Sequence, residues 1–566
     1  MTNDTRIAVI GMALKYPSAN NIEEFHRILA EGDFVPVGNQ QIRGDLLGIP
    51  DYKRLINNIR LIDGIDEFDN TLFGIVTSEA REMPPEMRIS LQCSAEAIMN
   101  AGYSIREIGE RNCGAVISHE SSNYRKLLDK STALTFFNNK PGMTGGYLSH
   151  YLKLTGPLYT LDSTCSSSIT AVATACGHLI MGQADMMIVG GVQICLPLNE
   201  QEGKDMMIST LRLSSNQRCI PFDVNAAGFY NSEGAGFVLL ERYEDAIKNG
   251  DNILGVITGY GMYSNSDKSQ TVYAPYAEAQ IKAREIAWKM AGVNCNDITE
   301  YEPHGSATKQ GDASEAKNFI SAFSERSNPQ KVYLSAVKSN FGHTACAAGV
   351  TGLLKVLSGF THNMVYPISG FTKAAPELEL DKANIMPVSE AITMPVDKKR
   401  IVDLSSYGLN ELNINVVIEN YIDKNKNLSN ATSHDRFLKC SAKSEAQVRV
   451  YFENIAEDIN KCDDDKFWDM IYTLNLGRDD YKFRCFITFE SKEELLDALK
   501  QDINIVKCKP TNEVSDATDK EKLKEDYLNG KNIDWKKWYS SRKYNRIPAT
   551  VYPFSNKSIW PAIKQK

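Results

Sequence analysis

One thiol, that of Cys165, stands among small residues in the segment D-S-T-C-S-S-S (162–168). An apolar run typical of a strand (158–161) precedes this segment, and a run typical of a helix follows it. Backbone amides at the start of a helix favour negative charge, so this position favours the thiolate, which is the nucleophilic form. A buried structural cysteine is the alternative, because the chain holds twelve cysteines.

Two of the eight histidines have matching surroundings. His304 follows a strand-like run in E-P-H-G-S-A-T (302–308), and His343 follows another in K-S-N-F-G-H-T (338–344). Each has a glycine neighbour and nearby hydroxyl residues, which a histidine that only bonds a carbonyl does not need. A thiol and two imidazoles in such settings predict a site of nucleophilic catalysis. Asp312 is expected to cap the helix that follows His304.

These three segments resemble the motifs of the β-ketoacyl synthases, and within them the ketosynthase domains of modular polyketide synthases. The family patterns are T-A-C-S-S-S, H-G-T-G-T-x-x-G-D-x-x-E and K-S-N-x-G-H-x-x-A-A-A-G. This chain has S-T-C-S-S-S, H-G-S-A-T-K-Q-G-D-A-S-E and K-S-N-F-G-H-T-A-C-A-A-G, in the same order and with similar spacing. The resemblance covers residues 6–420, and three ordered motifs are far more specific than one.

The resemblance implies a decarboxylative Claisen condensation. Cys165 would take an acyl chain from an acyl carrier protein, and the enolate of a malonyl-type extender would attack that thioester to give a β-ketoacyl thioester. Neutral His304 and His343 would donate hydrogen bonds to the developing negative charge, and one such donor is worth roughly 3–4 kcal/mol. Lys338 would orient His343 or bias its protonation, with a structural ion pair as the alternative.

The resemblance also assigns binding roles, and it breaks in one loop. It implies that Ser306 and Thr308 hold the pantetheine arm and that the Leu409 amide is an oxyanion donor. The family reads S-F-G-x-G-G-T-N-A-H where this chain reads S-Y-G-L-N-E-L-N-I-N (406–415), so Asn410 and Glu411 replace two glycines. If these positions need a positive φ, Asn tolerates it and Glu does so poorly.

The altered loop leaves three functions open. The first is an elongating polyketide β-ketoacyl synthase, a transferase of the acyltransferase type. The second is a non-elongating ketosynthase that transfers acyl chains between carriers, and the third is a non-catalytic scaffold of a synthase assembly. A scaffold has no need of Cys165, His304 and His343 together, so the third is the least favoured.

Short β-branched runs alternate with helix-length segments up to about residue 420, which predicts an α/β fold. The resemblance implies a thiolase-like five-layer αβαβα sandwich of two similar halves, usually a homodimer. Residues 1–250 would hold the cysteine, and residues 251–422 would hold both histidines. The strand candidates are 7–10, 115–118, 158–161, 186–189, 237–240, 254–258, 298–302, 332–337, 401–404 and 415–418.

The chain beyond residue 422 is expected to flank this body. A polar linker leads to a small α+β subdomain (436–505), which resembles the linker that follows such ketosynthases. Residues 506–530 are charged and predict a flexible connector, and the aromatic-rich tail (531–566) is expected to wrap back onto the ketosynthase. Because no acyltransferase motif lies between them, the implied partners are a separate acyltransferase and other polyketide synthase modules.

Composition excludes several other classes. The formal net charge of −8 argues against a general nucleic-acid binder. The sequence contains no apolar run of about 18 residues, so we expect no membrane-spanning helix. The start of the chain lacks the features of a signal peptide, and the dispersed cysteines never form C-x-x-C. We therefore expect a cytoplasmic protein without a metal. The resemblance implies no permanently bound cofactor, with 4′-phosphopantetheine supplied by the acyl carrier protein.

Overall fold

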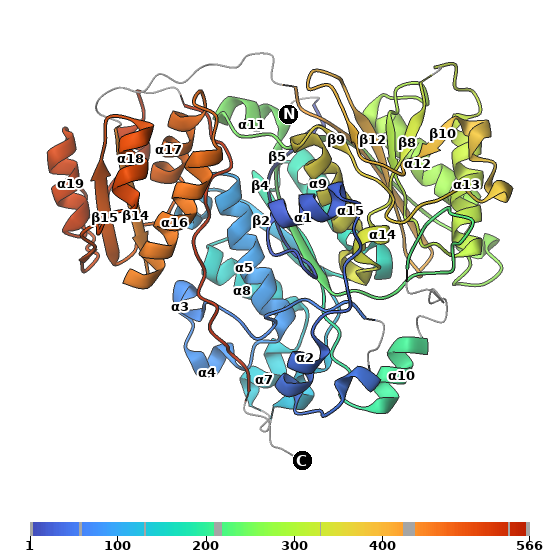
Figure 1. Cartoon of the computed structure of the whole chain (residues 1–566), viewed down its shortest axis with the longest axis horizontal. Helices are drawn as coiled ribbons and strands as arrows, with labels where there is room; N and C mark the ends of the chain where they lie inside the picture. Colours follow the sequence, from blue (N-terminus) through green and yellow to red (C-terminus); the bar gives the residue numbers. More distant parts are fainter. Residues whose placement is uncertain are drawn as a thin grey trace.

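The computed structural model describes residues 4–55, 59–128, 132–208, 218–328, 330–422, 436–541 and 544–561, so the linker expected at 423–435 lies outside the described residues. Eleven strands of the described core form one sheet, in the order β10-β8-β7-β12-β13-β6-β1-β5-β4-β2-β3 (Figure 1). They are β1 (Ile7–Lys15), β2 (Cys113–His119), β3 (Leu158–Leu161), β4 (Met186–Gln193), β5 (Gly234–Arg242), β6 (Gly255–Ser264), β7 (Glu300–Glu302), β8 (Val332–Leu334), β10 (Ile385–Pro387), β12 (Ile401–Tyr407) and β13 (Leu412–Glu419).

The sheet consists of two halves with the same topology. The first runs β3-β2-β4-β5-β1 and the second runs β8-β7-β12-β13-β6, with β10 added at its outer edge. In each half the first two pairings are parallel and the last two are antiparallel. The halves join edge to edge where Ile7 of β1 pairs with Ile257 of β6. The duplication expected of a thiolase-like fold is therefore confirmed.

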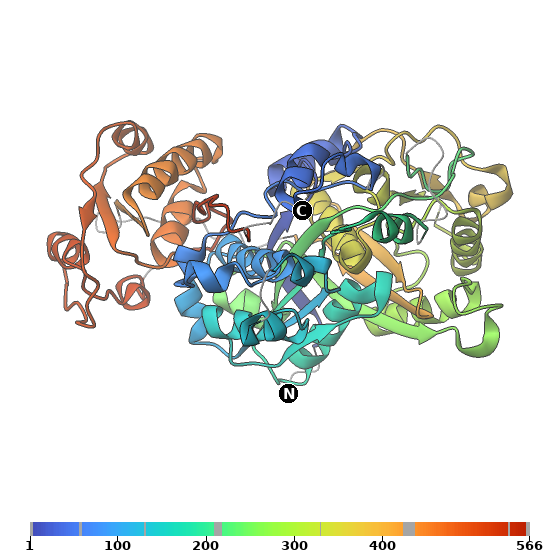
Figure 2. The same ribbon diagram turned by 90° about the horizontal axis from the view of Figure 1, so that it is seen from below.

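Helices cover both faces of each half, which completes the layers (Figures 1 and 2). The central layer holds α9 (Ser167–Ile180) and α15 (Ala348–Thr361), and nearly all residues of α15 are buried. A side chain at Gly349 would place its Cβ within 2.8 Å of Ile169 Cβ, so glycine lets the two helices pack closely. The outer helices are α5 (Pro85–Asn100) and α8 (Gly142–Leu152) on the first half, with α12 (Ala277–Ala291) and α13 (Lys309–Phe323) on the second.

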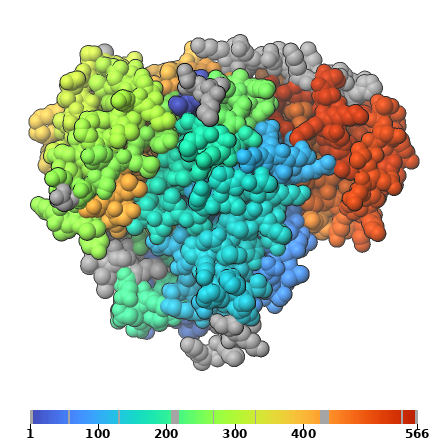
Figure 3. All heavy atoms as spheres, turned by 180° about the vertical axis from the view of Figure 1, so that it is seen from behind, coloured from blue at the N-terminus to red at the C-terminus, as the bar shows by residue number. Residues whose placement is uncertain are grey.

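A smaller α+β unit stands beside the first half, seen at the left in Figure 2 and at the right edge in Figure 3. Its sheet has the order β14-β15-β16, and its longest helix begins after the Ser444 cap. The elements are β14 (Phe437–Ala442), α16 (Glu445–Lys461), α17 (Phe467–Leu476), β15 (Phe483–Thr488), α18 (Lys492–Leu499) and β16 (Val506–Lys507).

Residues 506–530, expected to be a flexible connector, instead hold β16 and the helix α19 (Lys520–Leu528). Leu523 and Tyr527 are buried, and α19 packs against β15. These two residues are four apart, so they lie on one face of the helix. The expectation rested on the low apolar content of the window, and it overlooked that two well-placed apolar side chains can anchor a short helix.

The tail lies against the core after crossing from the smaller unit, as the dark red trace of Figure 1 shows. The Ile559 amide donates to the Asp66 carbonyl (2.7 Å), and Arg88 of α5 donates to the Ile559 carbonyl. Trp560 Nε1 donates to the Leu46 carbonyl (2.7 Å). Among the described residues, no helix has both the length and the apolar character that a bilayer crossing requires.

Candidate active site

Cys165, His304 and His343 line one cavity of about 110 Å³. Cys165 follows β3, His304 follows β7, and His343 follows β8 and the short helix α14 (Lys338–Phe341). The distance from His343 Nε2 to Cys165 Sγ is 3.1 Å. The two imidazole rings are nearly perpendicular, with centroids 5.7 Å apart. The structure thus brings together the three residues that the sequence singled out.

A tight turn presents the thiol. Cys165 lies in a 3₁₀ turn that leads into α9, and the preceding Thr164 has a φ of +56°, which is rare for a β-branched residue. Ser406 Oγ donates to the Cys165 carbonyl (3.1 Å). A side chain at Gly408 would place its Cβ only 2.6 Å from the Ser163 carbonyl oxygen. This glycine therefore allows the loop at 406–415 to pack against the turn.

The Cys165 side chain is a neutral thiol at neutral pH. Burial raises the pKa of Cys165 to about 11, although the positive charge of Lys338 lowers this pKa and the carboxylates of Glu120 and Asp162 raise it. The expected thiolate is therefore not the resting form, because the loss of solvation outweighs the favourable helix start. Of the four cysteines that are not fully buried, Cys165 is the one with a described histidine contact.

Both histidines are neutral and share one tautomer. The Ala345 amide donates to His343 Nδ1 (3.2 Å), and the Tyr407 amide donates to His304 Nδ1 (3.3 Å). An imidazole that accepts at Nδ1 carries its proton on Nε2. Burial lowers the pKa of both rings well below 6.5, and the charge of Lys338 lowers it further. Each ring can therefore donate from Nε2 to a negative charge that develops in the cavity.

Lys338 and Glu315 hold the backbone of the His304 segment. The buried Lys338 ammonium donates to the His304 carbonyl. The Glu315 carboxylate accepts the amides of His304 (2.9 Å) and Gly305 (2.7 Å). Lys338 thus bonds His304 directly and affects His343 through its charge. Glu315 was assigned no role from the sequence, although its place at the end of the H-G-S-A-T-K-Q-G-D-A-S-E motif was a usable signal.

Ser306 and Thr308 also line the cavity, with their hydroxyl oxygens 2.8 Å apart. Thr308 Oγ1 accepts the Gly311 amide (3.1 Å), so Thr308 is the residue that caps α13. Asp312, expected to be that cap, instead accepts the Phe222 amide (2.7 Å). The expectation failed because Thr308, three residues before Gly311, already occupies the capping position.

A second hollow of about 300 Å³ also includes Thr308 in its lining. It is lined by Ala226, Ala227, Gly228, Thr308, Lys309 and Gln310. Thr308 is therefore a residue that both spaces share. The exposed Val272 and Tyr273 line the cavity as well.

The loop at 406–415 keeps a backbone conformation typical of glycine at Glu411, one of the two positions where the family pattern has glycine. Glu411 has a φ of +69°, a value that favours glycine. Its carboxylate accepts a hydrogen bond from Ser269 (3.2 Å), and Glu411 is not among the residues that line the thiol cavity. The Leu409 amide, expected to be an oxyanion donor, donates to Thr164 Oγ1 (2.8 Å). Thus Glu411 is accommodated, and the Leu409 amide already has a partner.

Comparison with known families agrees with this geometry. The family described as "Beta-ketoacyl synthase, N-terminal domain" matches residues 4–246, and its C-terminal domain matches residues 254–372. The family described as "RhiE-like, KS-MAT linker domain" matches residues 440–505. These matches cover the first half of the core, the second half up to residue 372, and most of the smaller unit, in the order in which they occur.

Similar proteins include polyketide synthases of Bacillus subtilis (strain 168). The chain is 30% identical to polyketide synthase PksL, over 98% of this chain and 13% of that protein. It is 29% identical to polyketide synthase PksN, over 98% of this chain and 11% of that protein. The chain therefore spans only a small part of the length of these relatives.

Solved structures of similar proteins share the fold over nearly the whole chain. The ketosynthase from module 6 of the bacillaene synthase from Bacillus subtilis 168 has a TM-score of 0.83 at 28% identity, and the match covers 98% of this chain and 100% of that one. Ketosynthase twelve of the bacillaene polyketide synthase in Bacillus amyloliquefaciens gives 0.85 at 25% identity, over 99% and 100%. The chain therefore belongs to the β-ketoacyl synthase family, as a ketosynthase of the polyketide synthase type joined to its linker domain.

Proposed function

We propose that this ketosynthase elongates acyl chains at Cys165. In the first step the Cys165 sulfur attacks the thioester carbonyl of an acyl carrier protein, the carrier thiol leaves, and the acyl chain remains on Cys165. The observation that carries the proposal is the neutral His343, whose Nε2 lies 3.1 Å from the sulfur. Its Nε2–H stabilises the negative charge on the Cys165 sulfur while the thiol proton passes to the departing carrier sulfur, which offsets the raised pKa.

In the second step a malonyl-type thioester on a carrier loses carbon dioxide. The electron pair of the broken carbon–carbon bond forms an enolate, whose oxygen accepts the Nε2–H groups of His304 and His343. The enolate carbon then attacks the Cys165 thioester carbonyl, and the Cys165 thiolate leaves with a β-ketoacyl carrier thioester as product. Two pre-oriented donors in a buried cavity suit this step, because they need little reorganisation when the charge appears.

An acyl carrier protein would deliver both substrates. Its phosphopantetheine arm, which is part of the substrate, would pass Thr308 and Ser306 from the outer hollow to the thiol cavity. We also propose that a separate acyltransferase loads the carrier, because the linker domain leads through 506–530 to the tail with no acyltransferase between them. Other polyketide synthase modules would supply the incoming chain, and the protein would work in the cytoplasm.

A homodimer is proposed on the basis of β3. This strand ends the eleven-stranded sheet, and an edge strand offers unpaired backbone groups. Tyr159 on β3 is 47% exposed, and Phe136 and Phe137 are also exposed. The teal region at the centre of Figure 3, to which β3 belongs, would then be the contact face.

A second candidate is a ketosynthase that transfers acyl chains without elongating them. The Leu409 amide favours this candidate because it already donates a hydrogen bond to Thr164 Oγ1. A thioester oxygen on Cys165 would therefore lack this donor during condensation. Acylation would still proceed, since it uses the Cys165–His343 contact.

One experiment distinguishes these candidates: purified protein is first given an acyl carrier thioester and then malonyl carrier. Elongation requires a mass increase on Cys165 followed by a β-ketoacyl carrier product, with both lost in Cys165→Ala. Acylation without that product would support transfer alone. No mass increase with several acyl donors would contradict both candidates.

A further inference from the structure

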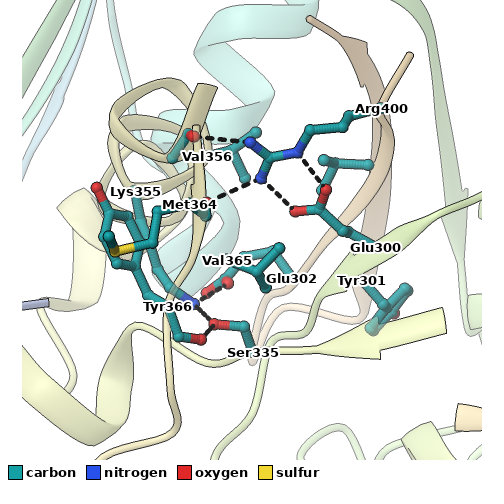
Figure 4. A pocket seen from close by; sticks show the side chains of 12 residues that line it. Glu300, Tyr301, Glu302, Ser335, Lys355, Val356, Met364, Val365, Tyr366 and Arg400 are labelled. Carbon is teal, nitrogen blue, oxygen red and sulfur yellow. Dashed lines mark hydrogen bonds and ion pairs between the residues drawn. The ribbon is translucent and has the colours of Figure 1, made fainter. Parts of the chain in front are cut away.

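Figure 4 shows a buried ion pair between Glu302 and Lys355. Glu302 Oε2 and Lys355 Nζ are 2.6 Å apart, and both side chains are 4% exposed. Glu302 is the last residue of β7, two positions before His304, and Lys355 lies in the middle of α15. Neither residue lines the thiol cavity. Any effect of this pair on the reaction must therefore pass through other residues.

The other oxygen of Glu302 bonds the second histidine segment. Glu302 Oε1 accepts the Val337 amide (2.8 Å), and Val337 immediately precedes α14, which leads to His343. One carboxylate is thus attached by the chain to the His304 segment and by a hydrogen bond to the His343 segment. The Lys338 ammonium, which donates to the His304 carbonyl, links the same two segments a second time.

Lys355 and its neighbours leave the carboxylate no freedom to turn. Lys355 Nζ also contacts Ser335 Oγ, and Ser335 Oγ donates to the Tyr366 carbonyl (2.6 Å). On α15, a side chain at Gly352 would place its Cβ 3.3 Å from Glu302 Cγ, so the helix backbone packs directly on the glutamate. Figure 4 shows Ser335, Lys355 and Glu302 converging from three elements.

We propose that Glu302 and Lys355 are positioning residues that set the separation of His304 and His343. This inference rests on the roles proposed above for the two histidines. Lys355 neutralises a buried carboxylate, which keeps that carboxylate ionised and free to accept the Val337 amide. Without the cation, the carboxylate gains a proton or turns away, and the two histidine segments lose a common anchor.

The same strand offers a matched control. Glu300, two residues earlier on β7, pairs with Arg400 through two contacts of 2.6 and 2.8 Å, and this pair is buried as well. Arg400 also donates to the carbonyls of Gly359 (2.7 Å) and Met364 (2.9 Å), which lie on neither histidine segment. Both pairs are drawn in Figure 4. Breaking the control pair therefore costs stability without releasing a histidine.

The test compares two double variants in the full chain. Glu302→Gln/Lys355→Met removes both charges but keeps an acceptor for the Val337 amide, whereas Glu302→Met/Lys355→Met removes that acceptor too. We expect the Met/Met variant to condense on the order of tenfold to a hundredfold more slowly per folded molecule, because an error of about 1 Å in placement can cost that much. The KM for malonyl carrier should stay unchanged, since neither residue lines the cavity. The Gln/Met variant should remain near the wild-type rate.

Glu300→Gln/Arg400→Met serves as the control, with folded fractions taken from circular dichroism and thermal unfolding. Equal condensation rates in the Met/Met and Gln/Met variants would overturn the proposal. So would an equal loss in the control. If the wild type acylates Cys165 but never condenses, the proposed elongation fails by itself. The histidine ring signals in ¹⁵N NMR then test the positioning, which requires a change in Met/Met and none in the control.

Discussion

The Leu409 amide donates a hydrogen bond of 2.8 Å to the hydroxyl of Thr164, the residue before the nucleophile. The related sequence pattern has Ala at the position of Thr164, and Ala has no hydroxyl. This threonine also has a φ of +56°, so the turn keeps it at a conformational cost. The Thr164 hydroxyl therefore accepts the hydrogen bond that the Leu409 amide could otherwise donate to the thioester oxygen.

Removing this hydroxyl should speed condensation. In Thr164→Ala the Leu409 amide has no partner at rest and can donate to the thioester oxygen on Cys165. One such donor changes turnover by about a hundredfold or more in other enzymes, and we expect a rise of roughly tenfold in β-ketoacyl product. Thr164→Ser keeps the hydroxyl and should match the wild type. A slower Ala variant would mean that the hydroxyl itself assists the reaction.

Glu411→Gly should stabilise the protein without changing its rate. A left-handed backbone costs a non-glycine residue about 1–2 kcal/mol, so we expect a gain of about 1 kcal/mol in the free energy of unfolding after the Ser269 contact is lost. Urea unfolding measures this gain. Glu411→Ala keeps the strain and loses the contact, so it should be no more stable than the wild type. A faster Gly variant would show that Glu411 hinders the reaction after all.

Asp312 should make the protein less stable as the pH rises. Burial, with a smaller effect of Glu315, raises the pKa of its carboxyl from 3.8 to about 8, although the hydrogen bond from the Phe222 amide lowers it. Between these values the folded state holds a proton that the unfolded state has lost, so stability falls from about pH 4 to pH 8.

Asp312→Asn removes this titration and keeps an acceptor for the Phe222 amide. Urea unfolding of both proteins at pH 5 and pH 8 should show the variant gaining relative to the wild type at the higher pH. A difference that is the same at both pH values would contradict a raised pKa, because it requires a folded-state pKa of Asp312 close to the unfolded value.

Tyr159→Asp should yield a monomer. The change puts a charge on the edge strand β3, where a second copy would add its own strand. Size-exclusion chromatography with light scattering should give half the mass of the wild type. Val396→Asp, at a side chain that is 73% exposed elsewhere, should leave the mass unchanged. A wild type that is already monomeric would contradict the proposed contact.

The strands that carry the site were predicted from short runs rich in β-branched, aromatic and other apolar residues, bounded by turn-forming residues. The run at 158–161 became β3 with identical bounds, and the run at 332–337 ended earlier, at Leu334. The three reacting groups were found because a thiol and two histidines lie at strand ends beside small residues. Their mutual distances depend on long-range packing and could not be predicted.

Other features depend on contacts that a sequence does not display. The raised pKa of Cys165 comes from burial by segments distant in the chain, which outweighs the local effect of the helix start. The hydrogen bond between Thr164 and Leu409 joins residues 245 positions apart. The two glutamates of β7 look alike in sequence, and only the structure shows that Glu302 bonds the second histidine segment while Glu300 does not.

The tail places a constraint on the order of folding during synthesis. Arg88 of α5 and the Ile559 carbonyl that it bonds are 471 residues apart. The ribosome makes the amino-terminal part first. The outer face of α5 therefore lacks its contact with the tail until almost the entire described chain has been synthesised. During that interval Arg88 lacks its final partner and its neighbours are open to solvent, so nascent chains would be most vulnerable to proteases and most dependent on chaperones at this surface.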